Sequence, residues 1–505
     1  MAISPSANKD ERVKARADRS EQTEKRAVLR SVNPYNGQTL KTYNEMTPKE
    51  VDHAIGQAHL RFMTWRRTSI PERAALLLKA ADLCLEREEE LARLMTLEMG
   101  KRIAEARKEV KLCASIFEYY GIRAHEFLQP QWLPSALPDG TLLQEPLGVI
   151  FGIEPWNYPS YQVVRMAAPN LAAGNTVVMK HASNVPQCAE ALEKIFHDAG
   201  FPPGAYTNLA ISSQLANQVI DDDRVQGVSF TGSNHTGAKV AERSGRNVKK
   251  TILELGGSDP FIVLDDAEIT LAVDQAVVGK MTNMGQSCVA AKRFIVHEDV
   301  SGEFVDHFRA KLFELKMGDP LDQTTGVAPL SSPRAAEILE DQVNRSVAGG
   351  AKVILGGKRA DSGSAFFEPT ILIEVKKGTP AYDEELFGPV ASVMIVPDEK
   401  TAIAVANDTK FGLGASVYTI DPKRGRRVAD QIDAGMVYIN HPAWIYEDMP
   451  FGGIKKSGYG RECGPLGIEE FLNKKLVTPF APSAESRRFG LFAATISQES
   501  RSFSI

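Results

Sequence analysis

The sequence has few cysteines, little net charge and no long apolar run, and each shortage excludes a class of protein. Five cysteines in 505 residues are too few and too scattered for a disulfide framework or a cysteine-based metal site. A formal net charge of −5 offers no basic surface for nucleic acid or acidic membranes. No apolar run approaches the roughly 18 residues that span a bilayer. We therefore expect free thiols, no metal and a cytoplasmic location.

The first thirty residues are also poor in large apolar side chains. They contain no apolar segment of the kind that secretory signals need. Their basic residues are interspersed with acidic ones, which argues against an organelle transit peptide (Asp10, Glu11, Asp18, Glu21 and Glu24). A charge-rich segment of this composition cannot bury enough apolar surface to fold alone. We predict a flexible N-terminal arm over residues 1–30.

Beyond the arm, helical patterns come first, and short strands alternate with helices afterwards. Thr47-Pro48-Lys49-Glu50 combines a capping box with proline at the first helical position, and predicts a helix start. Apolar-periodic stretches follow at about 72–99 and 103–120. Short apolar strands are predicted at 149–153, 176–179, 227–230, 260–264, 294–297, 352–355, 390–396 and 415–419, with helices between them. This alternation indicates an α/β fold of mostly parallel sheets, in which ligands bind beyond strand ends.

Cys288 lies between a glycine-containing turn and the strand predicted at 294–297. In such a place, exposed backbone N–H groups favour the thiolate, which is the nucleophilic form. A cysteine in this setting, taken alone, is more often a small buried packing residue. Its neighbours in the fold therefore decide its role.

A carboxylate and a side-chain amide stand at the ends of two other predicted strands. Glu254 interrupts an apolar strand that ends in two glycines, where burial can raise its pKa towards that of a general base. It could equally cap a loop or pair with a lysine. Asn157 follows the strand at 149–153, where its amide could stabilise an oxyanion or cap the next helix. Both roles of Asn157 can hold at once.

Two further strand ends carry residues that suit a nucleotide. Lys180 directly follows an apolar strand and can reach a ribose or a phosphate. Gly232 and Ser233 form a turn into a helix, whose N-terminal amides and dipole favour a pyrophosphate. The glycine spacing differs from the usual G-x-G-x-x-G pattern, so this turn is a weak signal by itself.

Taken together, these residues resemble the aldehyde dehydrogenase superfamily. The likeness runs from about Asn33 to about Val477. Six motifs occur in the order and spacing of the family: Pro155-Trp156-Asn157-Tyr158-Pro159, Phe230-Thr231-Gly232-Ser233, Glu254-Leu255-Gly256-Gly257, Gly285-Gln286-Ser287-Cys288, Glu385-Leu386-Phe387-Gly388-Pro389 and Pro450-Phe451-Gly452-Gly453. Within the superfamily the sequence looks most like the succinate-semialdehyde dehydrogenase branch, on residues 147–157 and 180–183.

The resemblance implies a covalent mechanism. Cys288 would attack the aldehyde, Asn157 and the Cys288 backbone N–H would hold the oxyanion, and Glu254 would activate the water that hydrolyses the thioester. Glu462 is a candidate for a proton relay, although a surface ion pair would explain it equally well. The resemblance also implies a cofactor site made of Trp156, Lys180, Ser183, Gly232, Ser233, Leu255, Glu385 and Phe387.

Ser183 bears on the choice of cofactor. Members of the superfamily that prefer NAD commonly have a glutamate three residues after the lysine, where it binds the ribose hydroxyls. Here Ser183 occupies that position and Lys180 is the lysine. Without the negative charge, a 2′-phosphate is repelled less. We therefore predict that the enzyme uses NADP or NAD, with NADP slightly favoured.

A substrate site is predicted around a helix that starts near Pro159. Tyr158, Gln162 and Arg165 would share one face of it, at i, i+4 and i+7. Arg165 could then bind a substrate carboxylate through two hydrogen bonds, or it could be tied structurally to a neighbouring carboxylate. The carboxylate-binding role predicts oxidation of succinate semialdehyde or a similar carboxylated aldehyde.

Trp444 and Ile445 point to an alternative substrate. Together with Tyr446 they would make an apolar wall at a place where some branch members have a serine that helps to hold the carboxylate. Medium-chain or aromatic aldehydes would then be the substrates, with Arg165 structural. A third hypothesis is a catalytically silent binding or structural protein on the same fold.

The resemblance implies three structural parts. A Rossmann-type nucleotide-binding domain would comprise residues 31–125 and 147–256, and an α/β catalytic domain residues 257–456. A small β bridging element for oligomerisation would comprise residues 126–146 and 475–490. We expect a homodimer or homotetramer that acts on a small aldehyde.

Overall fold

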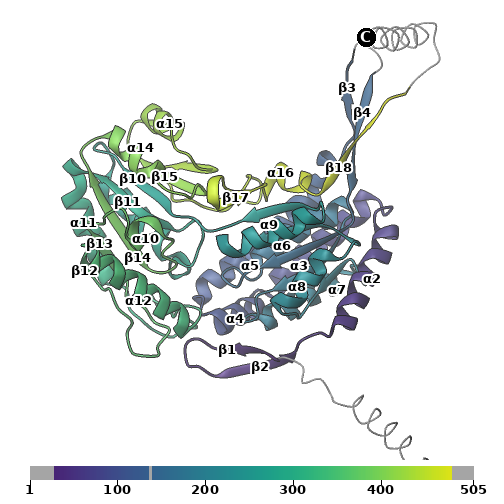
Figure 1. Ribbon diagram of the computed structural model, residues 1–505, viewed down its shortest axis with the longest axis horizontal. Helices are drawn as coiled ribbons and strands as arrows, with labels where there is room; N and C mark the ends of the chain where they lie inside the picture. The colour runs from purple at the N-terminus through teal and green to yellow at the C-terminus, as the bar shows by residue number, and fades with distance from the viewer. Residues whose placement is uncertain (1–27, 136–138, 480–505) are drawn as a thin grey trace, which may run out of the picture.

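The computed structural model describes residues 28–135 and 139–479. They form two α/β lobes, each built around one sheet, and a narrow three-stranded sheet that projects from the first lobe (Figure 1). Most of the predicted N-terminal arm, residues 1–27, lies outside the described residues. So does the stretch 480–490 of the predicted bridging element.

The first lobe contains a six-stranded sheet in the order β17-β9-β8-β5-β6-β7. Neighbouring strands are parallel except for β17, which runs antiparallel to β9. The strands are β5 (Val149–Glu154), β6 (Thr176–His181), β7 (Tyr206–Asn208), β8 (Val225–Thr231), β9 (Lys250–Glu254) and β17 (Gly458–Tyr459). The connecting helices are α6 (Tyr161–Ala173), α7 (Pro186–Ala199), α8 (Ser213–Asp221) and α9 (Asn234–Arg246). The chain order reverses between β5 and β8, the kind of switch point beyond which nucleotides bind.

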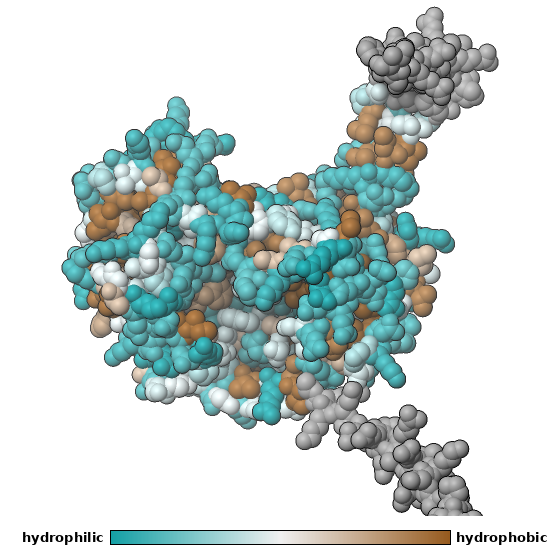
Figure 2. Space-filling view, in the orientation of Figure 1, coloured by the Kyte–Doolittle hydropathy of each residue, from teal (hydrophilic) through white to brown (hydrophobic). Residues whose placement is uncertain are grey.

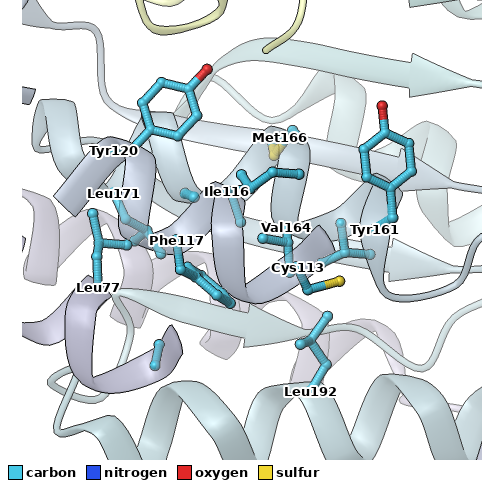
Figure 3. Close-up of a cluster of buried hydrophobic side chains, with 14 of the residues drawn as sticks. Leu77, Cys113, Ile116, Phe117, Tyr120, Tyr161, Val164, Met166, Leu171 and Leu192 are labelled. Carbon is cyan, nitrogen blue, oxygen red and sulfur yellow. The ribbon is translucent and has the colours of Figure 1, made fainter. Parts of the chain in front are cut away.

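Four helices precede this sheet in the chain: α2 (Pro48–Trp65), α3 (Ile70–Glu86), α4 (Glu88–Met99) and α5 (Ile103–Phe127). The predicted capping box at Thr47 is confirmed, because its side chain accepts a hydrogen bond from the Glu50 N–H. The single stretch predicted at 72–99 is instead two helices that meet at Arg87. A core between α5, α6 and their neighbours holds the helices against the sheet, and its labelled members in Figure 3 are Leu77, Cys113, Ile116, Phe117, Tyr120, Tyr161, Val164, Met166, Leu171 and Leu192.

The second lobe contains a seven-stranded sheet in the order β12-β13-β14-β11-β10-β15-β16, in which only β12 is antiparallel to its neighbour. The strands are β10 (Asp259–Val263), β11 (Ala291–His297), β12 (Lys352–Leu355), β13 (Thr370–Ile373), β14 (Val390–Val396), β15 (Gly414–Tyr418) and β16 (Met436–Ile439). The helices are α10 (Ile269–Met281), α11 (Glu298–Phe313), α12 (Pro333–Ala348), α13 (Pro380–Asp383), α14 (Glu399–Asn407) and α15 (Pro422–Ala429). The predicted α/β class with mostly parallel sheets is confirmed.

The projecting sheet joins two distant segments of the chain. β18 (Leu472–Val477) pairs along its whole length with β4 (Gly140–Pro146), and β3 (Gln131–Leu133) pairs with the other edge of β4. Apolar side chains gather on this sheet (Figure 2), among them Trp132, which is 65% exposed. Separately, β1 (Val28–Val32) and β2 (Thr39–Asn44) form a hairpin beside the first lobe, and α16 (Gly464–Glu469) leads into β18.

Two absences concern only residues 28–135 and 139–479. No helix within them is long and apolar enough to cross a membrane. No group of three or more histidine, cysteine, aspartate or glutamate side chains within them could hold a metal ion.

Candidate active site

The three predicted catalytic side chains converge from both lobes. Asn157 directly follows β5, Glu254 ends β9, and Cys288 precedes β11. The Asn157 side-chain nitrogen donates a hydrogen bond of 3.0 Å to the carbonyl of Gln286, two residues before Cys288. Because a side-chain amide carries two N–H groups, the second one stays available as a donor.

The turn before Cys288 has an unusual backbone. Asn283, Met284 and Gly285 all have positive φ, at 52°, 55° and 70°. The Asn283 side chain stabilises this geometry by donating to the carbonyls of Asn157 (2.8 Å) and Gln286 (3.0 Å). A Cβ atom on Gly285 would lie 2.2 Å from the carbonyl oxygen of Gly388. Glycine is therefore required here, because the turn packs directly against the segment that carries Glu385 and Phe387.

Cys288 is the only partly exposed cysteine of five, and none of the five forms a disulfide. Burial raises its pKa to about 12, although Lys292 and Arg165 lower it. Here the structure differs from the prediction that the turn favours a thiolate, because desolvation outweighs the nearby positive charges. Burial therefore favours the thiol over the thiolate at this position. A base must take its proton before it attacks.

Lys292 was not predicted from the sequence. Its ammonium donates to the carbonyls of Ser287 (2.8 Å) and Cys288 (2.7 Å), and it forms an ion pair of 3.1 Å with Glu385. These contacts fix the peptide of the nucleophile while the Cys288 N–H keeps no hydrogen bond to any described residue. The only signal in the sequence was a lysine beside Arg293 at the start of the strand.

Glu254 is almost fully buried, at 2% exposure. Neither of its carboxyl oxygens accepts a hydrogen bond from the residues that the structure describes. Burial raises its pKa well above the ordinary value, and Arg165 opposes this rise. A Cβ on Gly452 would lie 2.7 Å from one Glu254 oxygen, so glycine at that position gives the carboxyl room. The environment fits a general base that holds a proton more tightly than an exposed carboxyl.

Arg165 does not occupy the position predicted for it. Its guanidinium forms a buried ion pair with Glu462 and donates to the hydroxyls of Tyr161 (3.1 Å) and Thr231 (3.0 Å). The side chain is 1% exposed and is absent from the lining of the pocket described below. The Arg165 side chain points into the protein, where it meets Glu462. Glu462 was predicted to form a surface ion pair or to act as a relay, but it is buried.

Gln162 likewise contacts a catalytic group rather than the pocket. Its side-chain nitrogen donates 3.1 Å to the Asn157 side-chain oxygen. This bond fixes which end of the Asn157 amide points to the Gln286 carbonyl, and so it makes Gln162 a positioning residue. The predicted common face does not include Tyr158, which precedes α6 and lines the pocket, whereas Gln162 and Arg165 contact interior groups.

A pocket of about 260 Å³ opens beside Cys288 and reaches its two neighbours, Ser287 and Val289. Three of the predicted substrate residues, Tyr158, Trp444 and Ile445, line it. The other wall was not predicted. It comes from α5 and the turn before it and is lined by Lys101, Glu105, Lys108, Glu109 and Leu112. The remaining lining residues are Val278, Gly279, Thr282, Asn283, Ala290 and Ala443.

Lys101 and Glu109 form a buried ion pair below this wall. Lys101 also donates 2.8 Å to the carbonyl of Asn157, and its ammonium lies 3.7 Å from the centre of the Tyr158 ring. Glu109 accepts the backbone N–H groups of Ser160 and Tyr161, both at 3.0 Å. The pair therefore caps the start of α6 and fixes the peptide of Asn157. Its sequence signal was a glutamate on the apolar face of a predicted helix.

The predicted cofactor residues occupy two regions. Lys180 and Ser183 line a cavity of about 370 Å³ together with Arg30 and Glu45. Ser233 caps α9, with its hydroxyl accepting from the Thr236 N–H. A hydroxyl, a cation and a free helix N-terminus are the groups that bind a phosphorylated nucleotide.

The second region lies nearer to Cys288. Glu385 accepts the Gly257 N–H at 3.1 Å, and the rings of Trp156 and Phe387 meet edge to face at 5.9 Å between centres. A Cβ on Gly256 would lie 2.2 Å from Glu385, and one on Gly232 would lie 2.6 Å from the Phe230 ring. Glycines thus leave a backbone cradle along β8 and β9, which fits a dinucleotide. Leu255 is buried and packs against Gly237 of α9.

Comparison with known proteins agrees with this geometry. The chain matches the model of the aldehyde dehydrogenase family over residues 20–477. A succinate-semialdehyde dehydrogenase of Deinococcus radiodurans, named for NADP(+), is 50% identical over 450 residues, which are 89% of this chain and 94% of the relative. A probable succinate-semialdehyde dehydrogenase of Synechocystis, also named for NADP(+), is 43% identical and matches 89% of this chain and 99% of the relative.

Solved structures show the same likeness. A succinic semialdehyde dehydrogenase from Streptococcus pyogenes, in complex with NADP+ as the cofactor, matches with a TM-score of 0.88 at 39% identity. The match covers 90% of this chain and 100% of that chain. With the family model matching most of the sequence, and relatives matched over nearly their whole length, this protein belongs to the aldehyde dehydrogenase family.

Proposed function

We propose that the protein oxidises succinate semialdehyde to succinate with NADP. The observation that carries this is the convergence of the Cys288 thiol, the Asn157 amide and the Glu254 carboxyl beside one pocket. Ser287 and Val289 line that pocket, Asn157 donates to the Gln286 carbonyl, and Glu254 lies near enough to act on the pKa of Cys288. The relatives named above act on succinate semialdehyde by their names, and they support the choice of substrate. The small volume of the pocket also suits a four-carbon aldehyde.

In the first step, Cys288 adds to the aldehyde carbon. Glu254 is close enough to affect the pKa of the thiol, and its oxygens have no competing hydrogen bonds, so it can accept the thiol proton. As the sulfur–carbon bond forms, the carbonyl oxygen takes up negative charge. The second N–H of the Asn157 amide and the Cys288 N–H can stabilise that oxygen.

In the second step, the carbon is oxidised and the acid is released. The chemistry supplied by a bound NADP is the acceptance of the hydride that leaves this carbon, which gives a thioester on Cys288. Glu254 releases the thiol proton to solvent and then removes a proton from water as the water attacks the thioester. It passes this proton to the departing sulfur. The carbon–sulfur bond breaks, the acid leaves and the thiol is restored.

The residues around Lys180 support the choice of NADP. Ser183 is neutral, and two cations, Lys180 and Arg30, line the same cavity. Glu45 also lines it and is near enough to raise the pKa of Lys180, although burial lowers that pKa overall. The excess of positive charge favours a 2′-phosphate over two free ribose hydroxyls.

The cysteines bear on the cellular location of the protein. Free thiols at all five cysteines support a reducing compartment, and we propose the cytoplasm.

The small sheet formed by β3, β4 and β18 leaves Trp132, Leu133, Leu476 and Val477 at least 39% exposed. We propose that a second copy of the chain covers this surface in a homodimer or homotetramer.

A second candidate is favoured by the ion pair between Arg165 and Glu462. With Arg165 engaged, the wall formed by Trp444 and Ile445 would select an apolar aldehyde of medium length or an aromatic one. Specificity constants decide between the candidates. We expect the highest kcat/KM for succinate semialdehyde with NADP, in a panel that includes butanal, hexanal and benzaldehyde with both cofactors.

Cys288→Ala is the control for this panel. It should abolish oxidation of every aldehyde, whereas Cys113→Ala, which changes a core cysteine, should leave the specificity unchanged. A higher kcat/KM for hexanal or benzaldehyde than for succinate semialdehyde would overturn the proposed substrate. A large preference for NAD would overturn the proposed cofactor.

A further inference from the structure

The aldehyde pocket has four acidic or basic side chains in its lining, all from α5 or the turn before it: Lys101, Glu105, Lys108 and Glu109. Three of them are engaged by other protein groups. Lys101 and Glu109 pair with each other, as described above. Glu105 forms an ion pair of 2.7 Å with Arg102 and accepts the N–H of Asn283 at 3.0 Å.

Lys108 is different. It forms no ion pair or hydrogen bond with any residue in 28–135 or 139–479, and it is exposed. It lies on the pocket-facing side of α5, three residues after Glu105 and four before Leu112, which also line the pocket. Because the other charges cancel in pairs, the pocket has one uncompensated positive charge.

The rest of the pocket suits the non-reacting part of a short acid. One end reaches the neighbours of Cys288, while Leu112, Trp444 and Ile445 make an apolar stretch of wall. Lysine presents a compact ammonium on a flexible four-carbon stem, which can follow a ligand without a prebuilt fork. Arg165, the cation expected to do this, is held by Glu462.

We propose that Lys108 binds the carboxylate of the substrate and makes the pocket selective for short aldehydes with a terminal acid group. This proposal rests on the proposed function. The ammonium attracts the carboxylate as it enters and holds it away from Cys288, so that the aldehyde end faces the sulfur. Ground and transition states share this contact, and its loss should raise KM with little effect on kcat.

The test compares Lys108→Met with Lys111→Met. Lys111 lies one turn further on the same helix, pairs with Glu88 at 3.2 Å and does not line the pocket. Both variants are assayed with succinate semialdehyde and with butanal, which has the same chain length and no charge. Lys108→Met should raise KM for succinate semialdehyde by about five- to tenfold, the size expected of a partly exposed charge contact. KM for butanal should not change.

Two further measurements sharpen the result. Lys108→Arg should restore most of the affinity, because it keeps the charge. Raising the ionic strength should raise KM for succinate semialdehyde in the wild type and have much less effect in Lys108→Met. Equal effects of Lys108→Met on both aldehydes, or no effect on either, would overturn the proposal.

Failure of the proposed function looks different. In that case the wild type itself would turn over succinate semialdehyde no better than butanal. If instead the wild type prefers succinate semialdehyde and Lys108→Met keeps that preference, the proposed function stands and the role of Lys108 is refuted.

Discussion

Two buried ion pairs flank the catalytic groups, and they differ in how completely their charges are balanced. In the pair of Lys101 and Glu109, each partner also bonds to backbone: Lys101 to the Asn157 carbonyl, Glu109 to two N–H groups at the start of α6. In the pair of Arg165 and Glu462, the single cation faces further carboxyls. The pair of Lys101 and Glu109 fixes the backbone around Asn157. The pair of Arg165 and Glu462 changes the pKa of nearby carboxyl groups.

The carboxyls around Arg165 are Glu154, Glu254 and Glu462, and all three are buried. Burial raises the pKa of each, and Arg165 lowers all three. One buried guanidinium cannot fully stabilise three buried, ionised carboxylates, even with Arg461 also acting on Glu254, so this group retains protons that exposed carboxyls would lose. A catalytic base that must both accept and release protons benefits from such surroundings, and a structural cap does not.

The largest effect that this difference predicts is on Glu254. Glu254→Gln keeps the shape of the side chain and removes its basicity, so hydrolysis of the thioester should slow by roughly 10²–10⁴-fold. Formation of the acyl-enzyme should be affected less. Rapid mixing should therefore show a burst of NADPH close to one per active site, followed by slow turnover. Fast steady turnover by a folded variant would mean that another group is the base for hydrolysis.

Lys101→Met tests the structural pair and should act mainly on stability. It leaves the Glu109 carboxylate buried without its counter-ion, which typically costs about 3–5 kcal/mol in the free energy of unfolding. Denaturation by urea, followed by circular dichroism, measures this. The double variant Lys101→Met with Glu109→Gln removes both charges and should be less destabilised than the sum of the single variants. Exactly additive losses would show that the two side chains do not depend on each other.

The catalytic residues and the fold could be predicted from the sequence, whereas the partners in the two buried ion pairs could not. Cys288, Glu254 and Asn157 lie at or near the ends of strands in two sheets, and sequence motifs identified them. Their roles stay predictions. Strand periodicity placed β12 and β14 at the bounds that the structure has. The predictions of the family, the α/β fold and an aldehyde-oxidising enzyme are confirmed by the comparisons.

The partners of buried charges could not be predicted in this way. Arg165 was placed on the correct helix, but its side chain pairs with Glu462, almost 300 residues later in the chain, instead of lining the pocket with Tyr158. Lys101, Glu109 and Lys292 contact the site through backbone carbonyls and N–H groups, and these leave no pattern in a sequence. The spacing of residues in a helix predicts on which side of the helix a side chain lies. The partner in an ion pair depends on how distant parts of the chain pack together.

Gln162 offers a test of intermediate size. Gln162→Leu should remove the bond to the Asn157 oxygen and let the amide turn, with a loss of about tenfold in kcat/KM for a buried hydrogen bond. Because the effect acts through Asn157, it should be the same for succinate semialdehyde and butanal. A loss confined to the charged aldehyde would instead restore the substrate role first predicted for Gln162. Gln162→Glu, which can accept but not donate when ionised, should be at least as impaired.

The smallest expected effect is also the one that separates the two ion pairs most directly. Under conditions where hydrolysis of the thioester limits kcat, the rate should rise with pH as Glu254 loses its proton, at a pH above that of an ordinary carboxyl because burial raises its pKa. Arg165 lowers that pKa and Glu462 raises it. Glu462→Gln should therefore move the acid limb of the pH profile to lower pH, and Arg165→Met should move it to higher pH.

Lys101→Met is the matched control for these shifts, since the charges that act most on Glu254 include neither Lys101 nor Glu109. Arg165→Lys, which keeps the positive charge, should leave the limb nearer to its wild-type position than Arg165→Met does, and Glu462→Gln still gives a reading if Arg165→Met fails to fold. The distinction between an electrostatic and a structural ion pair would fail on either of two results. The acid limb could move in the same direction in Glu462→Gln and Arg165→Met, or it could move as far in Lys101→Met as in those two variants. Both pairs would then affect Glu254 only through packing. An electrostatic effect on the pKa of Glu254 reverses direction with the sign of the charge that is removed, whereas a packing effect does not.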